Sequence, residues 1–309
     1  MKSRIFLVVI FLFLVTACTA TPAAPTLPPT PAPTPSPTFA ASKFGASDID
    51  VTYCTMDGQP QKMDLYYPKS GGPWSVMIYV HGGSWTALDK AEGVGWRYLN
   101  DSGFLVVSVN YRLATTQVKF PVMIEDIKCA VRYLRAHSAE YHLNPDRIGA
   151  LGASAGGHLV ALLGTADKSA GWDVGEYLDQ SSRVQAVVTE SGLSDFTVPI
   201  NAGVSMAVYF AFGALAGDPD PRMATASPVT YITSDDPPFL IIHGDEDGTV
   251  PVEQAKILNE KLTKAGVSST LVIVQGAGHD LKGINGQPTV PTSAEISADI
   301  LKFLQTNLE

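Results

Sequence analysis

Residues 146–163 read DRIGALGASAGGHLVALL, and this stretch carries the strongest indication of the fold. Its first half is a short apolar run that predicts a buried strand, and its second half predicts a helix packed behind that strand. Between them, Gly152-Ala-Ser-Ala-Gly156 has the G-x-S-x-G pattern of a sharp strand-to-helix turn. Such a turn projects the Ser154 hydroxyl above the sheet, where the positive end of the helix dipole also points. The pattern alone would also fit a packing turn of small residues.

Strands and helices alternate on both sides of this turn. Apolar runs predict strands at residues 49–53, 62–67, 75–80, 104–109, 147–152, 184–189, 239–243 and 269–274. Amphipathic patterns predict helices at residues 93–102, 121–137, 157–163, 252–265 and 293–308. This alternation predicts an α/β domain with a mostly parallel sheet and helices on both faces. A ligand would then bind beyond the carboxyl ends of the strands.

The composition is that of a folded, acidic protein. The 309 residues are 45% hydrophobic and 17% charged, which excludes a disordered chain or a coiled coil. The formal charge is −9 and no basic patch stands out, so nucleic acid is not expected as a partner. Of the three cysteines, Cys54 and Cys129 fall within the domain, where they could be two buried thiols or a disulfide.

The N-terminus predicts export and a lipid anchor. Residues 1–17 have a basic start and a short apolar run, as in a secretory signal, and Val15-Thr-Ala-Cys18 resembles a bacterial lipobox. Residues 18–41 include eight prolines and read as a semi-rigid tether, and residues 42–309 as the folded domain. We therefore expect a protein lipidated on Cys18 and held at the bacterial cell envelope. An ordinary signal with a chance cysteine is the alternative.

A glycine-rich turn follows the strand at residues 75–80. In His81-Gly82-Gly83-Ser84-Trp85 the glycines would let backbone N–H groups approach a carbonyl oxygen. Together with the N–H of Ala155 they could form an oxyanion hole. A plain strand-end turn is the alternative, and the imidazole of His81 is expected to be structural.

A serine nucleophile needs a base and a carboxylate that orients the base. His279 follows the last strand in the loop Gly276-Ala-Gly-His-Asp280, and the other histidines fit a base less well. The acid should follow the penultimate strand, where His243-Gly-Asp-Glu-Asp offers both Asp245 and Asp247.

The chain resembles α/β-hydrolases of the hormone-sensitive-lipase and bacterial feruloyl-esterase-like group. The resemblance rests on HGGSW (81–85), VSVNYRLA (107–114), FPVMIEDIKCAVRYLR (120–135), DRIGALGASAGGHLVALL (146–163) and HGDEDGTVP (243–251). It implies a serine carboxylesterase with Ser154 as nucleophile, Asp247 as acid and His279 as base. Many relatives have a third glycine where this chain has Ser84, so Gly82, Gly83 and Ser84 all remain candidates for the oxyanion hole beside Ala155. The HGGxW form also resembles kynurenine-formamidase-like enzymes.

The segment 195–232 is too long for a bare connection between strands, and we expect a small cap over the site. Met206, Tyr209 and Phe210 in that segment, and Trp85 beside the glycines, are candidate substrate-binding residues. Alternatively, Met206, Tyr209 and Phe210 belong to a helix that packs on the body of the domain, and Trp85 fills a core position.

The leading hypothesis is a hydrolase of short-acyl, acetyl or feruloyl-type esters, either small or linked to polysaccharide. The alternatives are an amide-directed hydrolase of the formamidase or peptidase type and a non-catalytic binding protein of the same fold. The sequence contains no recognisable metal cluster or cofactor-binding loop, so no metal and no cofactor are expected. It leaves the oligomeric state open.

Overall fold

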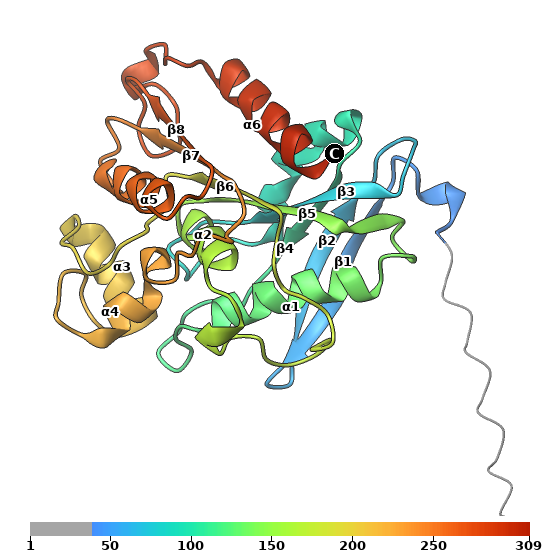
Figure 1. The fold of residues 1–309 in the computed structure, drawn as a ribbon, viewed down its shortest axis with the longest axis horizontal. Coiled ribbons are helices and arrows are strands. Elements are labelled where there is room, and N and C mark those ends of the chain that lie inside the picture. The colour runs from blue at the N-terminus through green and yellow to red at the C-terminus, as the bar shows by residue number, and fades with distance from the viewer. Residues whose placement is uncertain (1–38) are drawn as a thin grey trace, which may run out of the picture. The chain divides into compact units, whose positions relative to one another are not determined.

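The computed structural model describes residues 39–309, and its sheet confirms the expected α/β architecture (Figure 1). The strands are β1 (Ser47–Met56), β2 (Gln59–Tyr66), β3 (Trp74–Val80), β4 (Leu105–Val109), β5 (Leu143–Ala153), β6 (Ala186–Glu190), β7 (Phe239–Gly244) and β8 (Ser269–Val274). They lie in the order β1-β2-β4-β3-β5-β6-β7-β8. The pairs β1–β2 and β2–β4 are antiparallel, and every other neighbouring pair is parallel.

Helices cover both faces of the sheet. The helices are η2 (Lys90–Ser102), α1 (Val122–Ala136), α2 (Ala155–Thr165), α3 (Ala202–Phe212), α4 (Pro221–Ala226), α5 (Glu253–Lys264) and α6 (Ser293–Leu308), with short 3-10 turns η1 (Ala41–Lys43), η3 (Lys168–Ala170), η4 (Pro228–Thr230) and η5 (Ile284–Gly286). One apolar cluster joins the sheet to α1, α2 and α5, and a second joins its other face to η2 and α6. Figure 1 shows α6 on the opposite side of the sheet from α1 and α2.

The parallel register brings the expected site loops to one edge. Val80 at the end of β3 pairs with Gly152 of β5, and Ala153 of β5 pairs with Glu190 of β6. Gly244 at the end of β7 pairs with Val274 of β8. Because the paired strands end together, the turns that follow β3, β5, β7 and β8 meet beyond the same edge.

The predicted element boundaries agree best where the sequence has strong local signals. The bounds of β8 and α6 are as predicted, and Thr292 and Glu295 form a capping box at the start of α6. The prediction is less accurate for residues 93–102, which belong to the 3-10 helix η2. Gly93 in η2 lies so close to Ser108 that a Cβ there would overlap the serine side chain. This contact with the sheet constrains the helix in a way that its periodicity does not predict.

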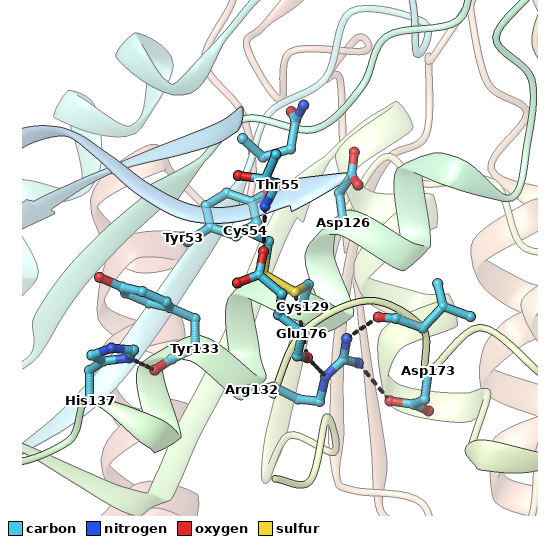
Figure 2. The surroundings of a disulfide bond; sticks show 12 residues. Tyr53, Cys54, Thr55, Asp126, Cys129, Arg132, Tyr133, His137, Asp173 and Glu176 are labelled. Atoms are coloured by element: carbon cyan, nitrogen blue, oxygen red, sulfur yellow. Dashed lines mark hydrogen bonds and ion pairs between the residues drawn. A yellow bond between two sulfur atoms is a disulfide. The ribbon is translucent and has the colours of Figure 1, made fainter. Parts of the chain in front are cut away.

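The two domain cysteines form a disulfide. Cys54 of β1 and Cys129 of α1 are bonded, with their Cα atoms 6.4 Å apart, and this decides between the two alternatives left open above. Figure 2 shows the bond between the strand and the helix, beside Arg132 and Asp173. Arg132 donates to the Asp173 carboxylate at 2.9 Å and to the carbonyl of Glu176 at 3.0 Å. The disulfide therefore anchors α1 to β1 next to a buried ion pair.

The predicted signal, Cys18 and most of the tether lie outside the described residues. The described part begins at Phe39, whose ring packs against Trp74 and His142 at centroid distances of 5.2 and 5.3 Å. The domain boundary at residue 42 stays a prediction. Within residues 39–309, no helix has both the length and the apolar character needed to span a bilayer.

Candidate active site

Ser154 lies on a strained turn between β5 and α2. Its backbone has φ 55° and ψ −120°, an unusual conformation for a residue with a side chain. The N–H of Ser154 donates to the carbonyl of Glu190 at 2.8 Å, and its own carbonyl accepts from His158 at 3.0 Å. The turn is thus held by β6 on one side and by α2 on the other, and it presents the hydroxyl beyond the sheet.

The glycines on either side of Ser154 are required by close backbone contacts. A Cβ at Gly156 would overlap the carbonyl oxygen of Val80, and a Cβ at Gly152 would overlap the carbonyl of Gly156. Any larger residue would push α2 away from β3 or open the turn. The G-x-S-x-G pattern therefore reflects a steric need of this turn as well as the chemistry of the serine.

His279 connects Ser154 to Asp247. The Ser154 hydroxyl donates to Nε2 of His279 at 2.9 Å, and Nδ1 of His279 donates to Oδ2 of Asp247 at 2.7 Å. The three side chains come from positions 154, 247 and 279, on turns that follow β5, β7 and β8. This is the nucleophile, base and acid arrangement of acyl-transfer enzymes. The structure thus brings together the three residues that the sequence and the resemblance proposed.

Asp247 is held as a carboxylate by several donors. Its side chain is fully buried, and its Oδ1 accepts from the N–H groups of Thr249 and Val250 at 2.8 and 2.9 Å. Burial alone would raise the pKa of Asp247, but hydrogen bonds from His243 and His279 hold that pKa well below its usual range. Asp247 is therefore ionised at neutral pH and can stabilise a positive charge on His279.

Asp245, the other candidate for the acid, does not face His279. Its Oδ1 accepts from the N–H of Gly276 at 2.7 Å and ties the loop after β7 to the loop after β8. Asp245 therefore connects two loops, whereas Asp247 is the carboxylate that bonds Nδ1 of His279.

The glycine-rich turn lies directly beside the nucleophile. A Cβ at Gly82 would lie 3.4 Å from Cβ of Ser154, and Gly83, Ser84 and Trp85 all have positive φ angles of 91°, 53° and 62°. Ala155 is the first residue of α2, so its N–H has no partner within the helix. These backbone groups have the location that an oxyanion hole requires. His81 is buried with its Nδ1 2.9 Å from the carbonyl of Gly82, and burial lowers its pKa.

Trp85 lies in the core, so the structure favours the core position over a substrate-binding role for this residue. Its ring is 1% exposed and packs against Phe196 and Phe212, and its Nε1 donates to Nδ1 of His158 at 3.2 Å. Burial lowers the pKa of His158 to about 4, so the ring is neutral and accepts this hydrogen bond.

The cap segment forms α3 and α4, and α3 has one buried and one exposed side. Val208, Ala211 and Phe212 are buried, whereas Met206, Tyr209 and Phe210 are 61%, 52% and 38% exposed. The helix therefore packs on the body of the domain, and a substrate-binding role for Met206, Tyr209 and Phe210 stays a prediction. Among residues 39–309, no cluster of His, Cys, Asp and Glu is arranged to hold a metal ion.

Two further residues of this region, Tyr111 and His243, have no role that the sequence predicts. The Tyr111 hydroxyl donates to the carbonyls of His81 and Gly82, and His243 contacts Asp247. Both lie in stretches on which the family resemblance rests, residues 107–114 and 243–251. No local sequence pattern, however, predicts which atoms these two side chains contact.

Several characterised proteins are similar to this chain. It is 32% identical over 222 residues to the probable carboxylic ester hydrolase LipM of Mycobacterium tuberculosis, covering 68% of this chain and 50% of that protein. It is 30% identical over 251 residues to esterase LipC of the same organism, covering 78% of this chain and 62% of that protein. The chain thus spans about half to three-fifths of the length of these relatives.

Solved structures support the same grouping. A truncated carbohydrate esterase from gut microbiota has a TM-score of 0.71 and 28% identity, covering 87% of this chain and 99% of that one. The thermophilic esterase Est2 of Thermogutta terrifontis has a TM-score of 0.65 and 26% identity, covering 77% and 84% of the two chains. A profile of the BD-FAE family matches residues 63–262, more than half of the 309, and includes Ser154 and Asp247. With the α/β-hydrolase sheet and the serine turn in place, the chain belongs to the BD-FAE family of α/β-hydrolase esterases.

Proposed function

We propose that this protein is a serine carboxylic-ester hydrolase that works through an acyl-enzyme on Ser154. The observation that carries the proposal is the continuous hydrogen-bond chain from Ser154 through His279 to Asp247, with distances of 2.9 and 2.7 Å. Membership of an esterase family and similarity to named ester hydrolases support it.

The reaction would proceed in two acyl transfers. Oγ of Ser154 attacks the ester carbonyl carbon while Nε2 of His279 accepts its proton. The negative oxygen of the tetrahedral intermediate is stabilised by N–H groups of the turn 82–84 and of Ala155. The carbon–oxygen bond to the alcohol then breaks, and the alcohol leaves with the proton held by His279. A water molecule, deprotonated by Nε2 of His279, then attacks the acyl carbon; the bond to Oγ of Ser154 breaks, Oγ takes the proton back from His279, and the acid is released.

Asp247 keeps the imidazole in the reactive tautomer throughout. Its hydrogen bond to Nδ1 leaves Nε2 free to accept the serine proton, and its negative charge stabilises the imidazolium that forms.

Short-acyl, acetyl or aryl esters are the proposed substrates, free or attached to carbohydrate. α3 exposes the large apolar side chains of Met206, Tyr209 and Phe210, and we propose that they contact the acyl or aryl group. A structural relative described as a carbohydrate esterase supports a sugar on the alcohol side.

The test compares residues 39–309 with its Ser154→Ala variant on p-nitrophenyl acetate, butyrate and octanoate, on methyl ferulate and on acetylated xylo-oligosaccharides. We expect ester hydrolysis that the variant abolishes, with rates that fall from butyrate to octanoate. Hydrolysis of N-formyl or peptide amides with none of esters would favour the amide-directed alternative. Folded protein without any activity above that of the variant would favour a binding protein.

We also propose that the protein is exported and anchored through a lipid on Cys18. The disulfide between Cys54 and Cys129 supports export, because such bonds persist in oxidising compartments. Metabolic labelling with a fatty acid tests the anchor. Label should appear in the wild-type protein and be absent from Cys18→Ala, and equal labelling of the two would contradict the assignment.

A further inference from the structure

Two histidines contact the same oxygen atom of Asp247. Nδ1 of His279 lies 2.7 Å from Oδ2, and Nε2 of His243 lies 3.2 Å from the same Oδ2. His243 is the second-to-last residue of β7, and its side chain is only 1% exposed. The proposed mechanism uses His279 and leaves His243 without a role.

The hydrogen-bond partners of His243 determine which way its proton points. Nε2 of His243 faces two acceptors, Oδ2 of Asp247 and the carbonyl of Val250 at 2.9 Å. Nδ1 of His243 is buried and has no hydrogen-bond partner within residues 39–309. The tautomer with its proton on Nε2 is therefore favoured; in that form the N–H of His243 donates to the carbonyl of Val250, and Nε2 lies 3.2 Å from Oδ2 of Asp247.

His243 adds a contact to the donors around the carboxylate. The backbone N–H groups of Thr249 and Val250 donate to Oδ1, and Nδ1 of His279 donates to Oδ2. Nε2 of His243 lies 3.2 Å from the same Oδ2, so it restricts that oxygen from a second side. The backbone turn fixes one oxygen, and only side chains fix the oxygen that faces His279.

We propose that His243 is a positioning residue for the esterase reaction. It holds Oδ2 of Asp247 toward His279, and it limits how strongly that oxygen binds the protonated form of His279. This inference rests on the proposed function. Removing the His243 contact leaves Oδ2 with His279 as its remaining side-chain partner, so the imidazole is less rigidly oriented toward Ser154 and the chemical step slows. It also leaves more negative charge on Oδ2 for His279, which stabilises the imidazolium and moves the titration of His279 to higher pH.

The ionisable groups around His243 come from three elements. They are Asp247 on the loop after β7, Glu253 at the start of α5 and, across Asp247, His279 on the loop after β8. His243 contributes to lowering the pKa of both Asp247 and Glu253. Replacing His243 therefore changes the pKa of Asp247, which it contacts directly, and the pKa of Glu253 at longer range.

The test compares His243→Leu, which removes the donor, with His243→Gln, whose amide N–H can replace Nε2. His243→Met, with a flexible side chain and no donor, serves if the leucine variant does not fold. Tyr133→Phe is the matched control, because Tyr133 lies on α1, away from the triad, and the change removes its buried 2.6 Å hydrogen bond with Tyr141. For each variant, kcat and KM for p-nitrophenyl acetate are measured from pH 5 to 9, with thermal unfolding. The titration of His279 is followed by NMR of ¹⁵N-histidine-labelled protein.

We expect His243→Leu or Met to lower kcat about 10-fold with little change in KM, and to move the His279 titration midpoint upward by a few tenths of a pH unit. His243→Gln should recover most of kcat and the wild-type midpoint, and Tyr133→Phe should change only thermal stability. Equal rates for the donor-free and glutamine variants, or an unchanged midpoint, would overturn the inference. The NMR midpoint needs no substrate, so it decides the inference even if ester hydrolysis itself is not found.

Discussion

Tyr111 and His81 form a stacked pair next to the glycine-rich turn at residues 82–84. Their ring centroids are 4.3 Å apart, and the Tyr111 hydroxyl lies 3.1 Å from the carbonyl oxygens of both His81 and Gly82. One phenol thus binds two consecutive carbonyls of the backbone that leads into Gly83. Because both carbonyls are held by this hydroxyl, the N–H groups of this turn have a fixed direction before substrate arrives.

Replacing Tyr111 with Phe tests this support. The ring and its stacking remain, but the two carbonyls lose their donor, so the turn 82–84 should become less well oriented. We expect kcat for p-nitrophenyl acetate to fall about 3- to 10-fold with KM nearly unchanged. Tyr53→Phe is the control, because the Tyr53 hydroxyl bonds the neighbouring carbonyl of Asn110 at 2.6 Å and does not contact the turn. Similar kinetic losses in both variants would argue against a specific role.

Asp247→Asn should nearly abolish ester hydrolysis, because an amide cannot stabilise the imidazolium and can impose the wrong tautomer on His279. We expect kcat to fall by roughly 10³- to 10⁴-fold. Asp245→Asn is the matched control, since Asp245 bonds only the backbone of Gly276 and should lose less than about 10-fold in kcat. A larger loss at Asp245 than at Asp247 would reverse the assignment of the acid.

Glu190 gives the protein a pH-dependent stability near the nucleophile. Burial raises the pKa of Glu190 to about 7, whereas an unfolded glutamate titrates near 4.5. Between these pH values the folded state binds the proton more tightly than the unfolded state does, so stability falls as pH rises from 4.5 to 7. Glu190→Gln should therefore raise the free energy of unfolding above pH 7 by up to about 3 kcal/mol and change it little at pH 4.5. Urea unfolding at both pH values checks this, and a gain that is largest at the lower pH would contradict it.

The disulfide should stabilise the fold without taking part in catalysis. Cys54 and Cys129 are 75 residues apart, so reducing the bond releases a long loop in the unfolded chain. We expect the Cys54→Ala, Cys129→Ala double variant to lose about 2–4 kcal/mol in the free energy of unfolding. Its kcat at 25 °C should stay within about twofold of the wild-type value, because neither cysteine contacts the triad. Denaturant unfolding and initial rates measure the two effects, and an activity loss in folded protein would link α1 to the site.

Trp85 and the exposed face of α3 should respond differently to truncation. Trp85→Ala removes a fully buried ring and should cost about 3–5 kcal/mol of stability. Tyr209→Ala should leave stability nearly unchanged and lower kcat/KM for octanoate more than for acetate, by about 3- to 10-fold. Leu178→Ala is the control, since Leu178 is 53% exposed beside Arg132 on α1. If Tyr209→Ala and Leu178→Ala gave the same chain-length profile, α3 would have no part in acyl selection.

The elements of the sheet were largely predictable because their signals are local. The wholly buried strand at Trp74–Val80 reads as a continuous apolar run, and the capping residues of α6 mark its start. The geometry of η2 was less predictable, since the contact between Gly93 and Ser108 involves a strand that follows it in the chain. Periodicity within a segment carries no information about such a contact.

The succession of strands and helices along the chain, the turn at Ser154 and the short set of residues that could form the triad can all be predicted from the sequence. These depend on near neighbours, such as the glycines that flank the serine, and on motifs that keep their spacing. Three features appear only once the chain is folded: Cys54 bonds Cys129, Trp85 belongs to the core, and Asp247 contacts a second histidine. Ser154 and His279 are 125 residues apart and meet at 2.9 Å because parallel strands end at a common edge. Distances of that kind follow from packing between segments, which no single stretch of sequence contains.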